Sequence, residues 1–134
     1  MGLIHQDLSN RVIKCFYDVY NTLGYGFLEK VYENALYYEL TQNGIYCTKQ
    51  FPIKVHFKDQ LVGEYYADIL VEDKLILELK AAETIIEEHE FQLINYLKAT
   101  NIELGLLLNF GKAPQFKRKI FTNDKKQISI NLSN

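Results

Sequence analysis

The sequence YYADILVEDKLILELK, residues 65–80, predicts two β-strands that are joined by a tight polar turn at residues 72–74. The odd-numbered positions on either side of this turn are apolar: Ala67, Ile69, Val71, Leu75, Leu77 and Leu79. A three-residue turn places Leu70 opposite Ile76. The same register continues outward to the pairs Asp68–Glu78 and Tyr66–Lys80. A slip of one residue would mix the two faces on both strands, so this register is favoured.

Two carboxylates therefore face each other across neighbouring strands, and such like charges repel unless a cation lies between them. Mg²⁺ binds in proteins through one or two carboxylates, completed by waters and substrate phosphates. Lys80 lies two residues past Glu78 on the same predicted face, within reach of a metal-bound water or a phosphate.

The alternative is a solvated face on which Glu78 and Lys80 are ordinary surface charges. An isolated D…E-x-K pattern favours that alternative, because short motifs occur often by chance. Apolar residues on both faces beside the turn argue against it, since they indicate a strand pair that is buried on two sides.

Length and composition predict one domain, residues 1–134, with a substantial core. The apolar content of 48% and the charged content of 24% are ordinary for a soluble globular protein. No apolar run approaches the roughly 18 residues that a membrane span needs, and the N-terminus has no secretory pattern. Cys15 and Cys47 have no metal-ligand spacing, so we expect buried free thiols in a reducing cytoplasm.

The net charge of −2 hides an uneven distribution. Residues 1–110 carry 9 Lys and Arg against 16 Asp and Glu, whereas residues 111–134 carry 6 against Asp124 alone. A basic end segment on an acidic body fits an edge that follows a phosphate backbone. The same charge distribution fits a solvated strand and tail equally well. Charge alone does not decide between a phosphate-binding edge and a solvated segment.

Periodicity and turn residues predict the order of the elements. Helices are expected at residues 8–23, 27–43 and 85–100, and strands at residues 45–57, 65–71, 75–80, 104–110, 116–121 and 128–132. Pro52 indicates that the first strand is an edge strand or carries a bulge. The order is two helices, three antiparallel strands, a crossover helix and a buried strand, which predicts helices on both sides of a mixed sheet.

Three polar positions on the predicted helices have ordinary explanations. Glu29 lies in the first turn of its helix, where an acid is favoured by the macrodipole. Gln92 and Tyr96 are four residues apart and share one face of the crossover helix. His89 is expected to be a surface or half-buried histidine rather than a metal ligand.

Residues 26–32, GFLEKVY, have the spacing G-x-x-E-x-x-Y, and HEFQLINYLKAT (89–100) and LLLNFG (106–111) form a second pair of motifs. Together, across residues 8–120, they resemble the GxxExxY family of the PD-(D/E)XK nuclease superfamily. This resemblance implies an α/β fold with a restriction-endonuclease-like core. In that core a mixed central β-sheet is flanked by helices, in αβββαβ order after an extra N-terminal helix.

The resemblance also implies residue roles. Asp68 and Glu78 would hold the metal, Lys80 would complete the E-x-K triplet, and Glu29 would be the helical acid that many members place beside the metal. Gln92 and Tyr96 resemble the Q-x-x-x-Y motif that follows E-x-K in some members.

The chain departs from the family pattern at two positions. Tyr25 stands where the family commonly has proline, and Tyr66 stands where it often has arginine. Neither change removes a metal ligand, but Tyr66 lowers the positive charge available for phosphate.

The implied function is a Mg²⁺-dependent (or Mn²⁺-dependent) nuclease that hydrolyses phosphodiester bonds of nucleic acid, DNA rather than RNA. Small members of the superfamily often act as dimers, so a homodimer is expected by analogy. The alternative is a non-catalytic nucleic-acid-binding or assembly module on a nuclease-like fold, which the acidic body favours. A hydrolase of small phosphorylated substrates is a third hypothesis. The intact set of Asp68, Glu78 and Lys80 favours an enzyme, because a module that only binds does not need it.

Overall fold

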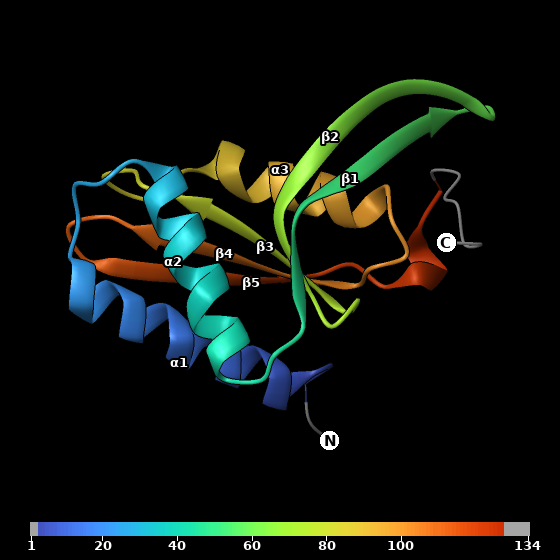
Figure 1. Ribbon diagram of the computed structural model, residues 1–134. Helices are drawn as coiled ribbons and strands as arrows, with labels where there is room; N and C mark the ends of the chain where they lie inside the picture. Colours follow the sequence, from blue (N-terminus) through green and yellow to red (C-terminus); the bar gives the residue numbers. More distant parts are fainter. Residues whose placement is uncertain (1–2, 128–134) are drawn as a thin grey trace.

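A computed structural model describes residues 3–127 of the chain, in which five strands form one mixed sheet with helices on both faces (Figure 1). The elements are α1 (Gln6–Leu23), α2 (Glu29–Gln42), β1 (Cys47–Phe57), β2 (Gln60–Val71), β3 (Leu75–Lys80), α3 (Glu87–Lys98), β4 (Leu104–Phe110), β5 (Pro114–Ile120) and a 3-10 turn (Asn123–Lys125). This confirms the predicted α/β class and the restriction-endonuclease-like order that follows α1. The strand predicted at residues 128–132 lies outside the described residues.

The strands lie in the order β1-β2-β3-β4-β5, and only β3 and β4 run parallel. Their parallel pairing requires the crossover that α3 supplies. Pro52 lies on the edge strand β1, as its missing N–H predicts. The predicted register is confirmed beside the turn, where Leu70 pairs with Ile76.

Beyond Asp68 the predicted pairing is wrong. The ladder between β2 and β3 ends at the pair Ile69–Leu77, so Tyr66 is not paired with Lys80. On its other side Tyr66 pairs with Pro52 of β1. From there β1 and β2 continue together as an arm, residues 51–66, that extends away from the sheet (Figure 1). Strand β2 is therefore five residues longer than predicted.

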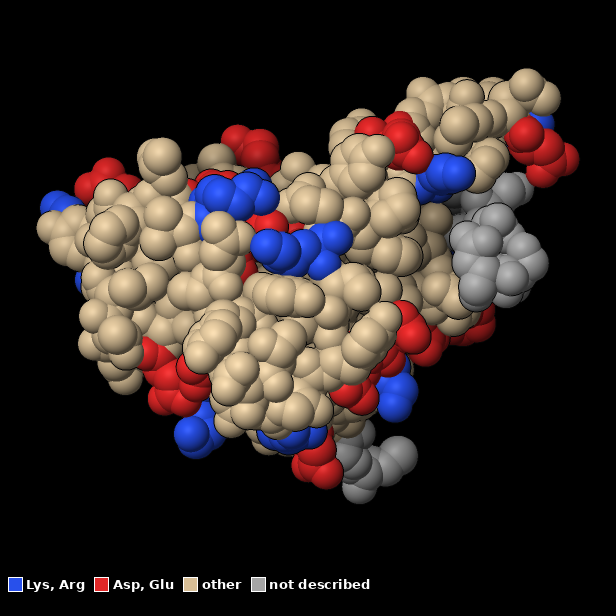
Figure 2. Space-filling model, in the orientation of Figure 1, with Lys and Arg blue, Asp and Glu red and all other residues tan. Residues whose placement is uncertain are grey.

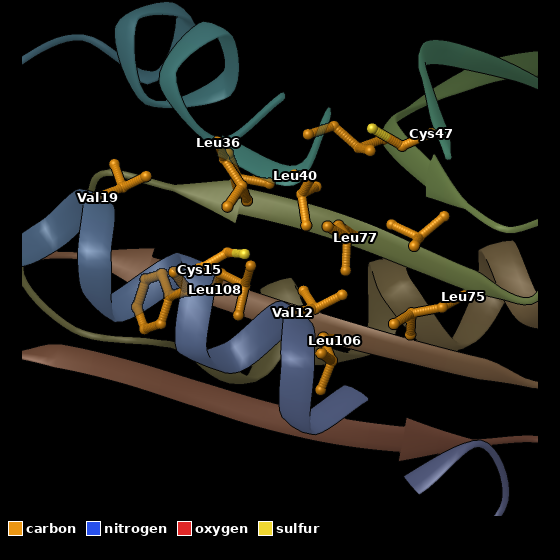
Figure 3. Packing of buried hydrophobic residues seen from close by; sticks show 14 of the residues in the cluster. Val12, Cys15, Val19, Leu36, Leu40, Cys47, Leu75, Leu77, Leu106 and Leu108 are labelled. Carbon is orange, nitrogen blue, oxygen red and sulfur yellow. The ribbon is translucent and has the colours of Figure 1, made fainter. Parts of the chain in front are cut away.

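One core lies between the sheet and the helices α1 and α2 (Figure 3). Its side chains come from apolar helix positions and from alternate positions of the strands, as both periods require. The labelled members are Val12, Cys15, Val19, Leu36, Leu40, Cys47, Leu75, Leu77, Leu106 and Leu108.

A second core lies under α3 on the opposite face of the sheet, where Leu93 and Leu97 pack with Leu70 and Ile76. Ala67 belongs to this second core, although strict alternation predicts that it shares the face of Ile69. The alternation is interrupted at Asp68, where β2 leaves β3.

No helix among residues 3–127 combines the length and the apolar character that crossing a bilayer requires.

Candidate active site

The candidate site lies where β2 and β3 separate. There, side-chain carboxylates instead of backbone carbonyls accept hydrogen bonds from the neighbouring strand. The Asp68 backbone N–H donates to Glu78 Oε1 at 3.0 Å, and the Leu79 N–H donates to Asp68 Oδ2 at 2.8 Å. Each carboxyl group is thus held by the backbone of the neighbouring strand. These two hydrogen bonds hold Asp68 beside Glu78 just beyond the last ladder pair, Ile69–Leu77, as the predicted register requires.

Burial makes both carboxyl groups costly to ionise. It raises the pKa of Glu78 to about 8, and the neighbouring charge of Asp68 acts in the same direction. Burial also raises the pKa of Asp68; the Leu79 hydrogen bond opposes this, and the charges of Glu33 and Glu29 add to it. The pair therefore favours a proton or another cation between its members.

The donor set of this pair fits a divalent cation. In each carboxylate, one oxygen accepts a hydrogen bond from a backbone N–H. The other oxygens, Asp68 Oδ1 and Glu78 Oε2, accept no hydrogen bond from residues 3–127. Two carboxylate oxygens, completed by water and phosphate, are a usual ligand set for Mg²⁺.

Glu29 does not form a cluster of three metal-binding side chains with Asp68 and Glu78. Within the described part of the chain, no three side chains of His, Cys, Asp or Glu stand close enough to hold one ion. Glu29 is exposed at the start of α2, although its charge raises the pKa of both Asp68 and Glu78. The expected convergence of three carboxylates is thus not seen, and a metal-binding role of Glu29 stays a prediction.

Lys80 and the two polar residues of α3 lie beside the carboxylates. Lys80 Nζ donates to Gln92 Oε1 at 3.2 Å, which ties the end of β3 to α3. Tyr96 is buried, and burial raises its pKa to about 12, with the charges of Glu78 and Asp68 acting in the same direction. Gln92 is thus linked to Lys80 of the E-x-K triplet, whereas the roles of Gln92 and Tyr96 in the site stay predictions.

Glu33 is a carboxylate near the site that the sequence interpretation missed. It is only 5% exposed, accepts from Gln50 Nε2 at 3.0 Å, and pairs with Lys30 Nζ at 3.1 Å. Among the nearby charges, its charge has the largest effect on the pKa of Asp68. The available signal was its spacing of four residues from Glu29, which puts both acids on one face of α2.

The G-x-x-E-x-x-Y motif builds the loop that leads into α2. Tyr32 is fully buried, and its hydroxyl donates to the Gly24 carbonyl at 2.6 Å and accepts from the Phe27 N–H at 3.2 Å. Gly26 has a φ of 110°, a conformation that L side chains rarely adopt. Tyr32 also stacks on Phe110 of β4, so the motif fixes the start of α2, and with it Glu29, against the sheet.

The segment after Lys80 is held by the end of β4. The buried Asn109 side chain accepts from the Ala82 N–H at 2.9 Å and donates to the Ala82 carbonyl at 3.0 Å. A Cβ at Gly111 would stand 2.5 Å from the same carbonyl oxygen, so only glycine fits there. Asn109 and Gly111 thus fix the backbone directly behind the E-x-K triplet.

His89 is half-buried, and its Nδ1 accepts from the Ile86 N–H at 3.3 Å at the start of α3. Burial lowers its pKa, and the charge of Lys80 acts in the same direction. These contacts fit the half-buried position that the sequence predicts.

On the face in Figure 2, basic and acidic side chains lie side by side and form no broad patch of one sign. The basic segment of β5 is partly neutralised, since Lys119 pairs with Glu90 of α3 at 2.5 Å. The charge pattern of this face therefore does not resemble a duplex-binding stripe.

The profile of the PD-(D/E)XK nuclease superfamily matches residues 6–120, which is most of the chain. The match covers both carboxylates at the β2–β3 junction, Lys80, and the helix that bears Gln92 and Tyr96. No curated protein and no solved structure gives a significant match. The family match covers every element from α1 to β5, and the fold agrees with it, so this chain belongs to the PD-(D/E)XK nuclease superfamily.

Proposed function

We propose that this protein is a metal-dependent nuclease that hydrolyses phosphodiester bonds of nucleic acid, with Mg²⁺ or Mn²⁺ bound by Asp68 and Glu78. One observation carries the proposal: each of these carboxyl groups is fixed by the opposite strand and keeps one oxygen free for a cation. A purely structural pair of buried acids would be expensive to maintain without a proton or a cation.

The residues around the pair have distinct proposed roles. The chemistry that the cation supplies is polarisation of the scissile phosphate and a lowered pKa for a nearby water. Lys80 orients that water or stabilises negative charge that develops on the phosphate. Gln92 positions Lys80 through their hydrogen bond, and Tyr96, one turn further along α3, is a second positioning residue. Glu29 acts as a third acid from the start of α2.

DNA is the proposed substrate, ahead of RNA, and the proposed location is the cytoplasm. The location is supported by Cys15 and Cys47, which are both buried as free thiols and so suit a reducing compartment.

The competing function is a nucleic-acid-binding or assembly module without catalysis. It is supported by the mixed charges in Figure 2 and by the finding that, among residues 3–127, no three side chains of His, Cys, Asp or Glu are placed to hold one ion. The two functions differ in whether Asp68 is needed for a reaction or only for the fold.

Calorimetric titration with Mg²⁺ and Mn²⁺, followed by cleavage assays on single-stranded, duplex and branched DNA and on RNA, tests the proposal. We expect Asp68→Asn to abolish metal binding and to slow cleavage by at least about a hundredfold. Asp73→Asn is the matched control, because Asp73 is exposed in the turn of the same hairpin and asparagine tolerates its positive φ. Cleavage that survives in Asp68→Asn would refute the proposed site, and nucleic-acid binding without metal binding or cleavage would favour the competing function.

A further inference from the structure

A pocket of about 440 Å³ lies between the arm and α3. It is lined by Val55, Tyr65, Glu88, Phe91, Gln92, Asn95, Tyr96 and Ala99. Its size falls within the range of roughly 300–1,000 Å³ that is typical of sites for small organic groups.

Two residues of the pocket wall link it to the proposed active site. They are Gln92, which accepts a hydrogen bond from Lys80, and Tyr96, whose pKa is raised by the charges of Glu78 and Asp68 as well as by burial. The ring of Tyr65 on the arm lies 5.7 Å from the ring of Tyr96 on α3, which links the arm to the site. We therefore expect that a strand held at the carboxylates through a phosphate can place a neighbouring base in the pocket.

The aromatic lining suits a flat, uncharged ring. Tyr65 and Phe91 both line the pocket and are 52% and 55% exposed, so much of each side chain remains accessible to a ligand. Aromatic side chains of this kind serve as stacking surfaces for the bases of single-stranded nucleic acids.

The charges of the lining exclude the phosphate backbone as the occupant. The lining contains no Lys or Arg, and its one charged side chain is the acid Glu88. The amide of Asn95 and the carboxylate of Glu88 can instead pair with the polar edge of a base. A base inside a duplex is stacked and paired, so it reaches such a pocket only after it leaves the helix.

We propose that this pocket binds an unpaired nucleobase of the substrate strand, stacked on Tyr65 and Phe91, and that the substrate is therefore single-stranded nucleic acid or a single-stranded end. The inference rests on the proposed nuclease function, because it assigns the substrate class of that same site. The arm acts as the wall that completes the base-binding pocket.

Fluorescence anisotropy in EDTA, with a labelled single strand, the matching duplex and an abasic strand of the same length, tests this assignment. We expect the single strand to bind more tightly than the other two probes. Tyr65→Ala and Phe91→Ala should each weaken its binding by about 5- to 140-fold, the usual cost of losing one stacked base. Tyr65→Trp should retain the binding.

Tyr66→Ala is the matched control, because Tyr66 is the next residue on β2, is also 52% exposed and does not line the pocket. It should bind the single strand within about twofold of the wild type. Equal binding of the single and abasic strands, or unchanged binding in both pocket variants, would overturn the inference. Cleavage that depends on Asp68 would then leave the nuclease function standing, whereas base-dependent binding without cleavage would support the pocket and refute that function.

Discussion

Asp68 and Glu78 lie side by side because each carboxyl group replaces a rung of the β-ladder. The Asp68 N–H donates to Glu78 Oε1 at 3.0 Å, where a regular antiparallel pair would bond to a carbonyl. This exchange separates β2 from β3 at that point and fixes the direction of both carboxyl groups before any ligand arrives. Such preorganisation is what a site for a small cation requires.

Divalent metal should stabilise the folded protein. At a concentration of about 100 times the dissociation constant, Mg²⁺ or Mn²⁺ should add about 2.7 kcal/mol to the free energy of unfolding. The gain is expected because the unfolded chain does not hold the two carboxylates together. Thermal unfolding with and without EDTA measures it, with Asp73→Asn responding as the wild type does. An Asp68→Asn variant that gains as much stability as the wild type would rule out the proposed ligand.

The stability of the metal-free protein should fall as the pH rises from about 4.5 to about 8, through the ionisation of Glu78. Its pKa in the folded state is raised from 4.5 to about 8, so in this window the folded protein holds a proton that the unfolded chain has lost. Glu78→Gln removes this titration and keeps an oxygen for the Asp68 N–H. Urea unfolding in EDTA should therefore show the variant gaining stability relative to the wild type across the window. Two curves that stay parallel from pH 4.5 to pH 8 would contradict this expectation.

Glu29→Gln should weaken the stabilisation by metal and leave the metal-free stability unchanged or improved. Glu29 is exposed and raises the pKa of both site carboxyls, so removing its charge relieves repulsion in the absence of metal. The free energy of unfolding with and without Mn²⁺ measures both effects. If the substitution instead destabilises the metal-free protein and leaves the metal response intact, Glu29 is a helix-start residue that serves the macrodipole.

Glu33→Gln is expected to behave differently from Glu29→Gln. Glu33 is buried and accepts hydrogen bonds from Lys30 and Gln50, so loss of its charge weakens two charge-assisted hydrogen bonds. We expect this loss, about 1 kcal/mol, to exceed the relieved repulsion with Asp68 and to lower the metal-free stability. Urea unfolding in EDTA measures this cost. Equal metal-free stability of the two variants would show that the charge of Glu33 does not contribute to the free energy of unfolding.

Tyr32→Phe should cost about 1–3 kcal/mol of unfolding free energy, because it leaves the Gly24 carbonyl and the Phe27 N–H without their side-chain partner. Stacking on Phe110 remains possible for phenylalanine, so the change isolates the hydroxyl. Tyr38→Phe, on the same helix and 63% exposed, serves as the control and should be neutral. Equal unfolding midpoints for the two variants would show that the hydroxyl does not hold the loop.

Sequence alone determined the elements and the inner part of the hairpin. The alternation around residues 72–74 and the length of that turn were enough to pair Leu70 with Ile76, because a slip would have exposed a whole apolar face. The same register placed Asp68 beside Glu78. The order of helices and strands followed from local periodicity, which depends only on neighbours along the chain.

Tertiary structure alone decided what surrounds the two carboxylates. The departure of the arm at Asp68, the shift of Ala67 to the core under α3, and the burial of Glu33 all depend on how separate elements pack. No local pattern encodes the distance between Tyr65 on the arm and Tyr96 on α3, because that distance follows from the twist of the sheet and the seating of the helix. Residues 31 positions apart in the chain thus come to form one pocket, which only the folded molecule contains.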